Sequence, residues 1–217
     1  MLIYVIRHGQ TVSNKERRFQ GQTECPLNKS GIRLAVETGK NLRGVHFDCA
    51  VTSPLSRAKV TAELVLRESG NTDTVLRCDD RLMELHCGAC EGVLCDADTP
   101  YREMIANFFT NPLTYTPDGF PGGESIAACM ARTQAVVREV AALPCETVLL
   151  STHGCAVRAM LNMFYDDPAD FWQGCVPPNC AVNIIEAKDG RLRLIEKDRL
   201  FYDPTLCEDC FPVGKQH

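Results

Sequence analysis

The chain has 217 residues, of which 45% are hydrophobic, and this length and composition suffice for one domain with a substantial core. Its formal net charge is -5, so we expect neither nucleic acid nor an anionic membrane as a partner, since both favour a broad basic surface. No apolar run approaches the length of a membrane-spanning helix, and the N-terminus lacks the layout of a signal peptide, so we expect a cytoplasmic protein.

Segments with strand and helix character alternate along most of the chain. Short apolar runs indicate buried strands, and apolar residues at helical spacing indicate helices. In chain order we predict a strand at Leu2–Ile6, a helix at Ser30–Leu42, a strand at Cys49–Thr52, a helix at Ala58–Leu66, a strand at Val75–Arg77, a helix at Ser125–Leu143, a strand at Thr147–Ser151, a helix at Ala156–Phe164, and a hairpin of Ala181–Glu186 with Leu192–Lys197.

Local signals refine these elements. Ser30 is the expected N-cap of its helix, Pro54 suits a first helical turn, and Asp189-Gly190 is typical of a tight hairpin turn. The alternation of strands and helices predicts the α/β class, as a three-layer sandwich with a mostly parallel central sheet. We expect residues 1–217 to form this single domain.

The segment at about 93–123 interrupts the alternation. It is rich in prolines and aromatic residues, namely Pro100, Pro112, Pro117, Pro121, Tyr101, Phe108, Phe109, Tyr115 and Phe120. We interpret it as a small cap inserted between core elements, which would influence substrate selectivity. The alternative is a plain surface excursion whose aromatic side chains only pack it against the core.

The chain contains 13 cysteines, a high and odd number. In the absence of an export signal we interpret them as reduced thiols, most of them small buried hydrophobic side chains. Two CxxC pairs, Cys87–Cys90 and Cys207–Cys210, would allow a zinc site, but such pairs also arise by chance in a cysteine-rich chain. We therefore predict no metal and no cofactor.

Two of the predicted strands end in a histidine followed by a glycine. Leu2–Ile6 leads into Arg7-His8-Gly9, and Thr147–Ser151 leads into Thr152-His153-Gly154. Ligands bind at the carboxyl edge of an open α/β sheet, and glycine lets an anion approach the backbone closely. Because the chain has only five histidines, this matched arrangement predicts a functional site that contains both.

Basic and acidic residues complete the predicted site. Arg7 adjoins His8, and Arg57 lies near the start of a helix that follows a strand, although Arg57 alone could form a surface ion pair. A guanidinium group offers paired donors to phosphate oxygens, so these residues favour a phosphate or another compact dianion. Glu84 is the expected proton donor to a leaving group, whereas we expect a structural role for Glu91.

Together these motifs resemble the histidine phosphatase superfamily, in the branch that includes phosphoglycerate mutases. The resembling segments are Arg7-His8-Gly9-Gln10-Thr11 with Asn14, Phe19-Gln20-Gly21 with Pro26-Leu27 and Gly31, Thr52–Ala58 with Thr61-Ala62, Leu82 with Glu84, Gly88 and Glu91-Gly92, Gly122–Ser125, and Thr152-His153-Gly154. They follow the family order from the start of the chain to about residue 185. Two positions depart from the pattern, because Glu24 replaces a common Asp and Cys155 replaces a common Gly.

The resemblance implies a role for each residue. His8 would attack phosphorus and form a phosphohistidine, and Glu84 would protonate the leaving group and then activate water. Binding of the phosphoryl oxygens would fall to Arg7, Arg57 and His153. The further substrate-binding residues implied are Asn14, Gly9, Gln20, Gly21 and Gly154.

The resemblance leaves hydrolysis and mutase activity to be distinguished. Phosphoglycerate mutases of this family share a longer insertion with several basic residues, whereas Arg102 is the one basic residue within Val93–Gly123. We therefore expect metal-independent hydrolysis of a small phosphorylated metabolite, with mutase activity as the alternative. A non-catalytic phosphate-ester-binding module is a third possibility, disfavoured because both the nucleophile and the acid are present. A homodimer is left open.

Overall fold

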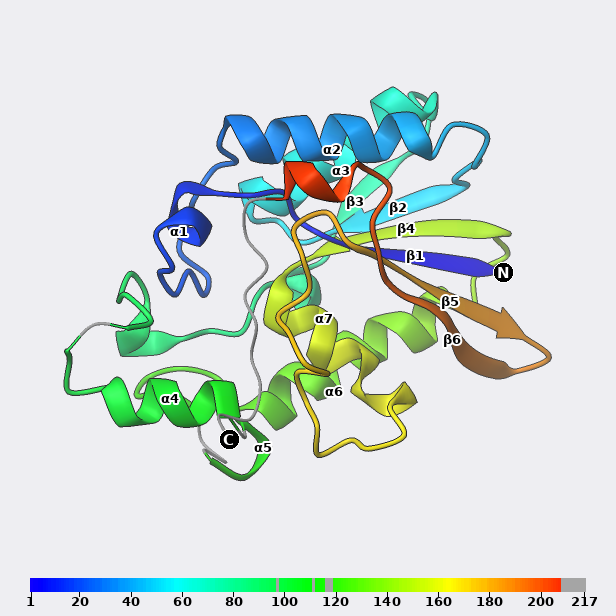
Figure 1. The fold of residues 1–217 in the computed structure, drawn as a ribbon. Helices are drawn as coiled ribbons and strands as arrows, with labels where there is room; N and C mark the ends of the chain where they lie inside the picture. Colours follow the sequence, from blue (N-terminus) through cyan, green and yellow to red (C-terminus); the bar gives the residue numbers. More distant parts are fainter. Residues whose placement is uncertain (97, 111, 116–118, 208–217) are drawn as a thin grey trace.

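The computed structural model describes residues 1–96, 98–110, 112–115 and 119–207. At its centre is a six-stranded sheet with the order β3-β2-β4-β1-β5-β6 (Figure 1). The strands are β1 (Leu2–Arg7), β2 (Cys49–Thr52), β3 (Leu76–Cys78), β4 (Thr147–Thr152), β5 (Val182–Lys188) and β6 (Arg191–Arg199). Neighbours among β3, β2, β4 and β1 pair in parallel, and β5 and β6 are antiparallel additions. The predicted mostly parallel sheet is confirmed.

Helices cover both faces of this sheet and produce three layers. One face carries α2 (Lys29–Asn41) and α3 (Ser56–Ser69), and the other carries α6 (Ile126–Val140) and α7 (Gly154–Leu161) (Figure 1). The predicted three-layer α/β sandwich is therefore confirmed. None of the helices in the described residues is long and apolar enough to cross a membrane.

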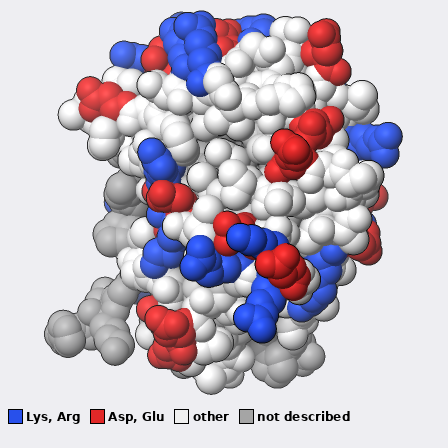
Figure 2. Space-filling view, turned by 90° about the vertical axis from the view of Figure 1, so that its right-hand side faces the viewer, with Lys and Arg blue, Asp and Glu red and all other residues white. Residues whose placement is uncertain are grey.

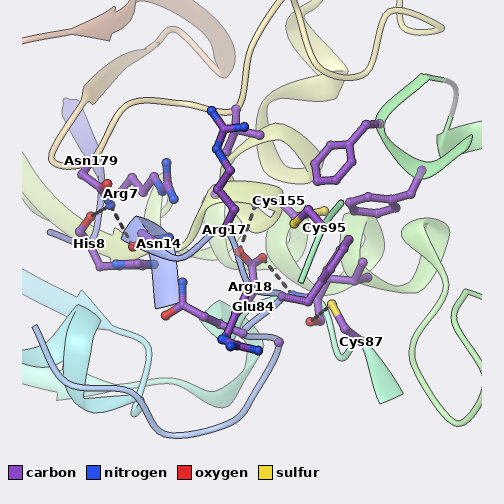
Figure 3. Close-up of a pocket in the computed structure, with 18 of the residues that line it drawn as sticks. Arg7, His8, Asn14, Arg17, Arg18, Glu84, Cys87, Cys95, Cys155 and Asn179 are labelled. Atoms are coloured by element: carbon purple, nitrogen blue, oxygen red, sulfur yellow. Dashed lines mark hydrogen bonds between the residues drawn. The ribbon is translucent and has the colours of Figure 1, made fainter. Parts of the chain in front are cut away.

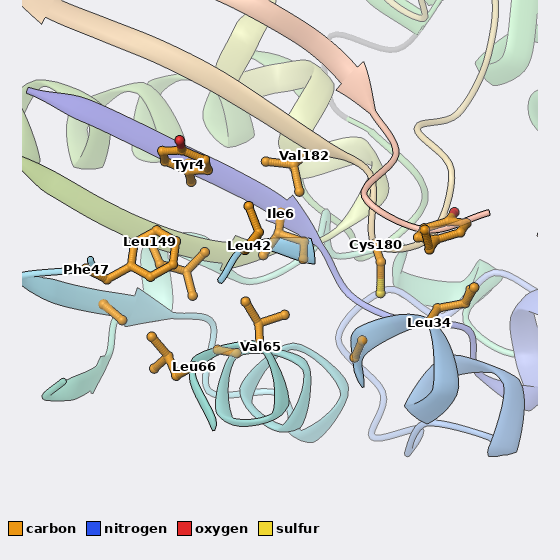
Figure 4. Close-up of a cluster of buried hydrophobic side chains, with 14 of the residues drawn as sticks. Tyr4, Ile6, Leu34, Leu42, Phe47, Val65, Leu66, Leu149, Cys180 and Val182 are labelled. Atoms are coloured by element: carbon orange, nitrogen blue, oxygen red, sulfur yellow. The ribbon is translucent and has the colours of Figure 1, made fainter. Parts of the chain in front are cut away.

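Strand β1 is buried on both faces, which explains its continuous apolar sequence. Tyr4 and Ile6 point into the core beneath α2 and α3 (Figure 4). Ile3 and Val5 point into the opposite core, beneath α6 and α7. Because successive side chains of a strand alternate between faces, a strand between two helix layers needs apolar residues at every position. This burial fixes the strand end from which His8 projects.

Two helix starts differ from the prediction. Helix α2 begins at Lys29 because the side chain of Asn28, rather than Ser30, accepts a hydrogen bond from the N–H of Gly31 at 2.8 Å. Helix α3 begins at Ser56, after an extended Leu55, so Pro54 precedes the helix instead of occupying its first turn.

Other boundaries shift by one to three residues. Strand β3 starts and ends one residue later than predicted, and α3 continues to Ser69. Helix α6 starts after its N-cap Ser125 and ends at Val140, while α7 begins at Gly154 and passes into a 3-10 turn at Asn162–Phe164. The hairpin turn is as predicted, since Asp189 and Gly190 both have positive φ.

The predicted cap segment contains two helices that the sequence pattern did not predict, α4 (Arg102–Thr110) and α5 (Pro112–Tyr115). The shorter remaining elements are α1 (Val12–Lys15) and 3-10 turns at Asp80–Leu82, Gly88–Cys90 and Pro204–Leu206. Pro117, within the cap, and Cys210, in the tail, lie outside the described residues.

The face at the amino ends of the parallel strands carries basic and acidic side chains interspersed with one another (Figure 2). Such mixed surfaces generate little long-range field of one sign. This face therefore offers little concentrated charge of one sign for a charged ligand.

Candidate active site

A cavity opens at the carboxyl ends of β1 and β4 (Figure 3). The predicted site residues that line it are Arg7, His8, Asn14, Gln20, Gly21, Arg57, Glu84 and Gly154. Two predicted residues lie behind the lining: Gly9 packs against α2, and His153 packs against His8 with ring centroids 5.1 Å apart. We call Arg7, His8, Arg57 and His153 the phosphoryl centre, after the group that the sequence resemblance implies they would bind.

His8 is held in a single tautomer. Its Nδ1 lies 2.7 Å from the carbonyl oxygen of Gly9, which can only accept, so Nδ1 carries the proton. Burial lowers the pKa of His8 well below its usual value, and the charges of Arg57 and Arg7 lower it further. The ring is therefore neutral, and Nε2 keeps a lone pair that can attack an electrophile.

Gly9 is required by packing. A Cβ atom at this position would lie 2.5 Å from the carbonyl oxygen of Gly31, at the start of α2. The Gly9 N–H also donates to Oγ1 of Thr61 at 2.9 Å. Besides the close approach of an anion that the sequence predicts, Gly9 therefore permits close approach of the α2 backbone.

Arg57 and His153 form a buried pair. Nε of Arg57 can only donate, and it lies 3.2 Å from Nδ1 of His153, so that nitrogen is unprotonated. The other ring nitrogen, Nε2, then donates to Oγ of Ser53 at 2.8 Å. Burial, followed by the charge of Arg57, lowers the pKa of His153 well below its usual value. Both imidazoles of the phosphoryl centre are therefore neutral in this structure.

Arg57 also fixes the loop that follows α1. Its guanidinium donates to the carbonyl oxygens of Gly21 at 2.7 Å and Thr23 at 2.8 Å. Gly21 has a φ of +52°, and a Cβ atom there would lie 2.1 Å from the carboxylate of Glu91. Glu91 accepts from the N–H of Gln22 at 2.9 Å and does not line the cavity. Its position matches the structural role expected from the sequence.

Arg7 presents an unsatisfied donor to the site. One of its terminal nitrogens donates to the carbonyl oxygen of Pro177, but the buried Nε has no hydrogen-bond partner among the described residues. A buried donor without a partner is costly, and an oxyanion ligand would remove that cost. Gly154 leaves room beside it, since a Cβ atom there would lie 3.3 Å from this Nε.

Glu84 caps the first turn of α7 from across the cavity. Its two carboxylate oxygens accept from the N–H groups of Ala156 at 2.9 Å and Cys155 at 3.1 Å. Arg132 donates to the backbone carbonyl of Glu84 at 3.0 Å and holds its loop. Glu84 contacts the backbone N–H of Cys155, not its side chain. The replacement of the family's common Gly by Cys155 therefore leaves this hydrogen bond intact.

Asn179 belongs to the site but was missed by the sequence analysis. Its Nδ2 donates to the carbonyl oxygen of His8 at 2.9 Å, and its buried Oδ1 has no partner among the described residues. Asn14 uses Oδ1 to accept from the N–H of Thr11 at 3.1 Å, which leaves its amide nitrogen as a donor. No motif signalled Asn179, because it lies in an irregular turn before β5.

The side of the cavity away from the phosphoryl centre is aromatic. We call Phe19, Phe108, Phe109 and Trp172 the aromatic wall. Two of these residues belong to the five aromatic residues predicted for the cap, and Phe120 supports them from behind, 3% exposed. Tyr101 does not line the cavity, and the side chain of Tyr115 lies outside the described residues.

The described residues contain no group of three or more His, Cys, Asp or Glu side chains arranged to hold a metal ion. Cys87 and Cys90 are buried under the cap, whereas Cys207 packs into the core beneath α2 and α3. Arg7 and Arg57 also place positive charge beside His8, which disfavours a cation there.

Comparisons with known proteins identify the family of this chain. The model of the histidine phosphatase superfamily (branch 1) matches residues 3–198. Probable phosphoglycerate mutase GpmB of Salmonella choleraesuis (strain SC-B67) is 31% identical, over 87% of this chain and 86% of its own. Bacillus stearothermophilus YhfR superimposes with a TM-score of 0.83 at 31% identity, over 91% of this chain and 96% of its own. Mycobacterial glucosyl-3-phosphoglycerate phosphatase superimposes with a TM-score of 0.75 at 26% identity, over 90% of this chain and 98% of its own. The chain belongs to the histidine phosphatase superfamily.

Proposed function

We propose that this protein is a metal-independent phosphomonoester hydrolase that acts through a phosphohistidine on His8. The observation that carries the proposal is the state of His8, a buried neutral imidazole with its Nε2 lone pair available beside two arginines. Neutral imidazole is the nucleophilic form, and fixed guanidinium groups stabilise the charge that develops on the phosphoryl oxygens.

The proposed reaction has two steps. In the first, Nε2 of His8 forms a bond to phosphorus while the ester P–O bond breaks, and Glu84 gives its proton to the departing oxygen. In the second, Glu84 takes a proton from water, the water oxygen attacks phosphorus, and the N–P bond breaks. Arg7, Arg57 and Asn14 hold the phosphoryl oxygens during both transfers, with Gln20, Gly21 and Gly154 shaping their pocket.

His153 is proposed to act with Arg57. Its Nδ1 accepts from Nε of Arg57, so the imidazole orients the guanidinium toward the phosphoryl group. A bound dianion would favour protonation of His153 at Nδ1. That nitrogen would then exchange its contact with Arg57 for a hydrogen bond that it donates to a phosphoryl oxygen, while Nε2 keeps its contact with Ser53. Gly9 contributes at His8, because its carbonyl oxygen accepts a hydrogen bond from Nδ1 and thereby orients the ring.

The aromatic wall supports hydrolysis over the mutase reaction. A mutase must bind a bisphosphorylated three-carbon acid, for which cationic side chains in the cap would be expected. Here Phe108 and Phe109 face the cavity from the cap, and Arg102 does not line it. We therefore propose a small phosphorylated metabolite whose leaving group has apolar or ring character. The mutase remains the second candidate because of the similarity to probable phosphoglycerate mutase GpmB.

The first test is hydrolysis of 4-nitrophenyl phosphate in excess chelator by the wild type, His8→Ala and His46→Ala. His46 is a matched control because its side chain is 84% exposed and does not line the cavity. We expect turnover by the wild type and His46→Ala only, with an acid-labile phosphoenzyme that His8→Ala cannot form. Activity of His8→Ala near that of the wild type, or full loss of wild-type activity with chelator, would contradict the mechanism.

A second assay separates the alternatives. Interconversion of phosphoglycerates that depends on a bisphosphoglycerate, at a rate above ester hydrolysis, would indicate a mutase. Tight binding of phosphate esters without any product would indicate a non-catalytic binding module. Hydrolysis of esters in the absence of bisphosphoglycerate is the result that we expect.

A further inference from the structure

The turn before β5 wraps around the end of β1 that carries His8. The backbone N–H of Cys180 donates to the carbonyl oxygen of Arg7 at 3.1 Å and, at 3.4 Å, to that of His8. The side-chain amide of Asn179 donates to the same carbonyl of His8 at 2.9 Å and, at 3.4 Å, to Oδ1 of Asn14 (Figure 3). Both amide hydrogens of Asn179 are therefore directed at residues of the proposed reaction.

The amide of Asn179 has a fixed orientation. A carbonyl oxygen can only accept a hydrogen bond, so the amide nitrogen must face His8 and Oδ1 must lie on the other side. This Oδ1 is buried and has no hydrogen-bond partner among the described residues. A buried acceptor without a partner lowers stability, so the needs of the fold do not explain an asparagine at this position. Its two donated hydrogen bonds point instead to a role in the site.

The contact with His8 matters because of the peptide unit that it fixes. The carbonyl of His8 and the N–H of Gly9 belong to one planar trans peptide group and point in opposite directions. Asn179 holds the carbonyl, and Oγ1 of Thr61 accepts from the N–H at 2.9 Å. The peptide is thus clamped at both ends, and the next carbonyl along the chain, that of Gly9, accepts from Nδ1 of the His8 ring at 2.7 Å. Asn179 therefore acts on the imidazole through one peptide unit.

Tyr202 holds Asn179 in turn. Its hydroxyl donates to the backbone carbonyl of Asn179 at 2.7 Å, and its side chain is buried. Burial raises the pKa of Tyr202 above its usual range, so the hydroxyl keeps its proton and stays a donor in neutral solution. The adjacent Cys180 has a φ of 56°, a left-handed conformation that a side chain disfavours and that the surrounding hydrogen bonds maintain. The turn that presents Asn179 is therefore held rigidly.

We propose that Asn179 is a positioning residue for the nucleophile, which keeps the His8 ring in the tautomer and orientation from which Nε2 attacks phosphorus. Tyr202, which does not line the cavity, supports it from behind. Attack requires Nε2 to lie at contact distance and in line with the ester bond, and a small misplacement of a reacting atom can cost about 10²-fold in rate. This inference rests on the proposed hydrolase function and deepens it.

The test compares Asn179→Ala with Asn183→Ala. Asn183 is a matched control, because it is also buried and has a side-chain atom with no partner among the described residues, but it does not line the cavity. Release of 4-nitrophenolate from 4-nitrophenyl phosphate in a single turnover measures the rate of phosphoenzyme formation. We expect this rate to fall by about 10²-fold in Asn179→Ala and to match the wild type in Asn183→Ala. Chemical denaturation measures the stability of each variant.

A spectroscopic readout separates positioning from a general loss of structure. Nitrogen-15 NMR of the imidazole distinguishes a ring with its proton on Nδ1 from one with its proton on Nε2. We expect the Nδ1–H form of His8 alone in the wild type and Asn183→Ala, and a mixture of both forms in Asn179→Ala. Tyr202→Phe, which removes only the hydroxyl, should slow phosphoenzyme formation by about threefold to tenfold, the net effect of one hydrogen bond.

A wild-type rate and a single tautomer in Asn179→Ala would overturn this inference alone. Equal slowing in Asn179→Ala and Asn183→Ala, in step with lost stability, would also overturn it, because the role would then be structural. If Asn179→Ala does not fold, Tyr202→Phe decides, and a wild-type rate in that variant would count against the inference. Failure of the wild type to form a phosphoenzyme would overturn the proposed function, whereas the tautomer comparison would still decide whether Asn179 positions the His8 ring.

Discussion

The phosphoryl centre and the aromatic wall face the same cavity but are built by different forces. In the phosphoryl centre directional hydrogen bonds fix each ring and guanidinium, as when Arg57 donates to both Gly21 and His153. In the wall apolar contact between rings predominates, beside the hydrogen bond that Nε1 of Trp172 donates to the carbonyl oxygen of Phe108. Phe108 lies 5.2 Å from Trp172 and 5.7 Å from Phe19, measured between ring centroids.

This difference indicates which part of the site can change. A hydrogen-bonded network fails when one partner is lost, because the other partner stays buried and unsatisfied. Apolar packing tolerates replacement by side chains of similar volume. Substitutions in the phosphoryl centre should therefore remove the chemistry, whereas substitutions in the wall should alter which leaving group is accepted.

The largest effect is expected for Arg57→Lys. A lysine keeps the charge but cannot donate at once to Gly21, to His153 and to a phosphoryl oxygen. We expect kcat/KM for 4-nitrophenyl phosphate to fall by about 10²–10³, as when one oxyanion-stabilising donor is removed. Arg43→Lys, at an exposed arginine in the turn that follows α2, is the control and should match the wild type. Wild-type activity of Arg57→Lys would contradict the proposed role of Arg57 in stabilising the phosphoryl group.

Glu84→Gln should produce a loss that depends on the leaving group. The amide keeps an oxygen that can accept from the N–H of Ala156, but it cannot deliver a proton to a departing alkoxide. We expect kcat/KM to fall about 10²-fold for an alkyl phosphate, and much less for 4-nitrophenyl phosphate, whose leaving group needs no proton. Glu91→Gln, on the same loop but outside the cavity lining, should affect both esters alike. Equal losses for the two esters in Glu84→Gln would argue against a general acid.

The sequence allowed the phosphoryl centre to be predicted because its residues are attached to strand ends. Register in a parallel sheet places Arg7 beside Thr152, so the residues that follow, His8 and His153, must lie close together. Short apolar runs that contain β-branched residues, such as Leu2–Ile6, favour strands over helices. The three-layer arrangement followed from the same runs, since β1 carries no charged residue from Leu2 to Ile6.

Other parts of the site could not be predicted in this way. Asn179, Arg17 and Trp172 come from irregular segments, and their approach to the cavity depends on tertiary contacts such as the 2.9 Å bond from Trp172 to the carbonyl oxygen of Phe108. The start of α2 was misplaced because Asn28 and Ser30 are both good capping residues, and only the fold shows which one accepts from Gly31.

A smaller effect, confined to selectivity, is expected for Phe109→Ala. The ring is half-buried, lies 5.8 Å from Trp172 and lines the cavity. We expect kcat/KM for 1-naphthyl phosphate to fall about tenfold relative to glycerol phosphate, because a large leaving group loses apolar contact and a small one does not. Tyr101→Ala, a cap aromatic outside the lining, should leave that ratio unchanged. Equal losses for both esters would indicate that the ring serves the phosphoryl centre as well.

The smallest effect concerns stability and pH, and it separates the two regions directly. Burial, together with neighbouring arginines, lowers the pKa of His8 and His153 in the folded state, whereas both rings return to about 6.5 when the chain unfolds. Below that pH the unfolded chain binds protons that the folded chain does not, so the free energy of unfolding must decrease as pH falls. At acid pH each histidine should make the free energy of unfolding change by up to about 1.4 kcal/mol per pH unit. Above pH 7.5 the contribution of each histidine to this slope should be almost zero.

Chemical denaturation of the wild type, His8→Asn and Phe109→Ala between pH 5 and 7.5 measures this slope. His8→Asn removes one titrating ring, and its curve should be shallower than that of the wild type on the acid side. Phe109→Ala should lower the free energy of unfolding by a similar amount at every pH, because its contribution is apolar packing that no proton changes. Parallel curves for the wild type and His8→Asn would mean that His8 titrates alike in the folded and unfolded states, which would remove the basis for a neutral nucleophile in acid solution.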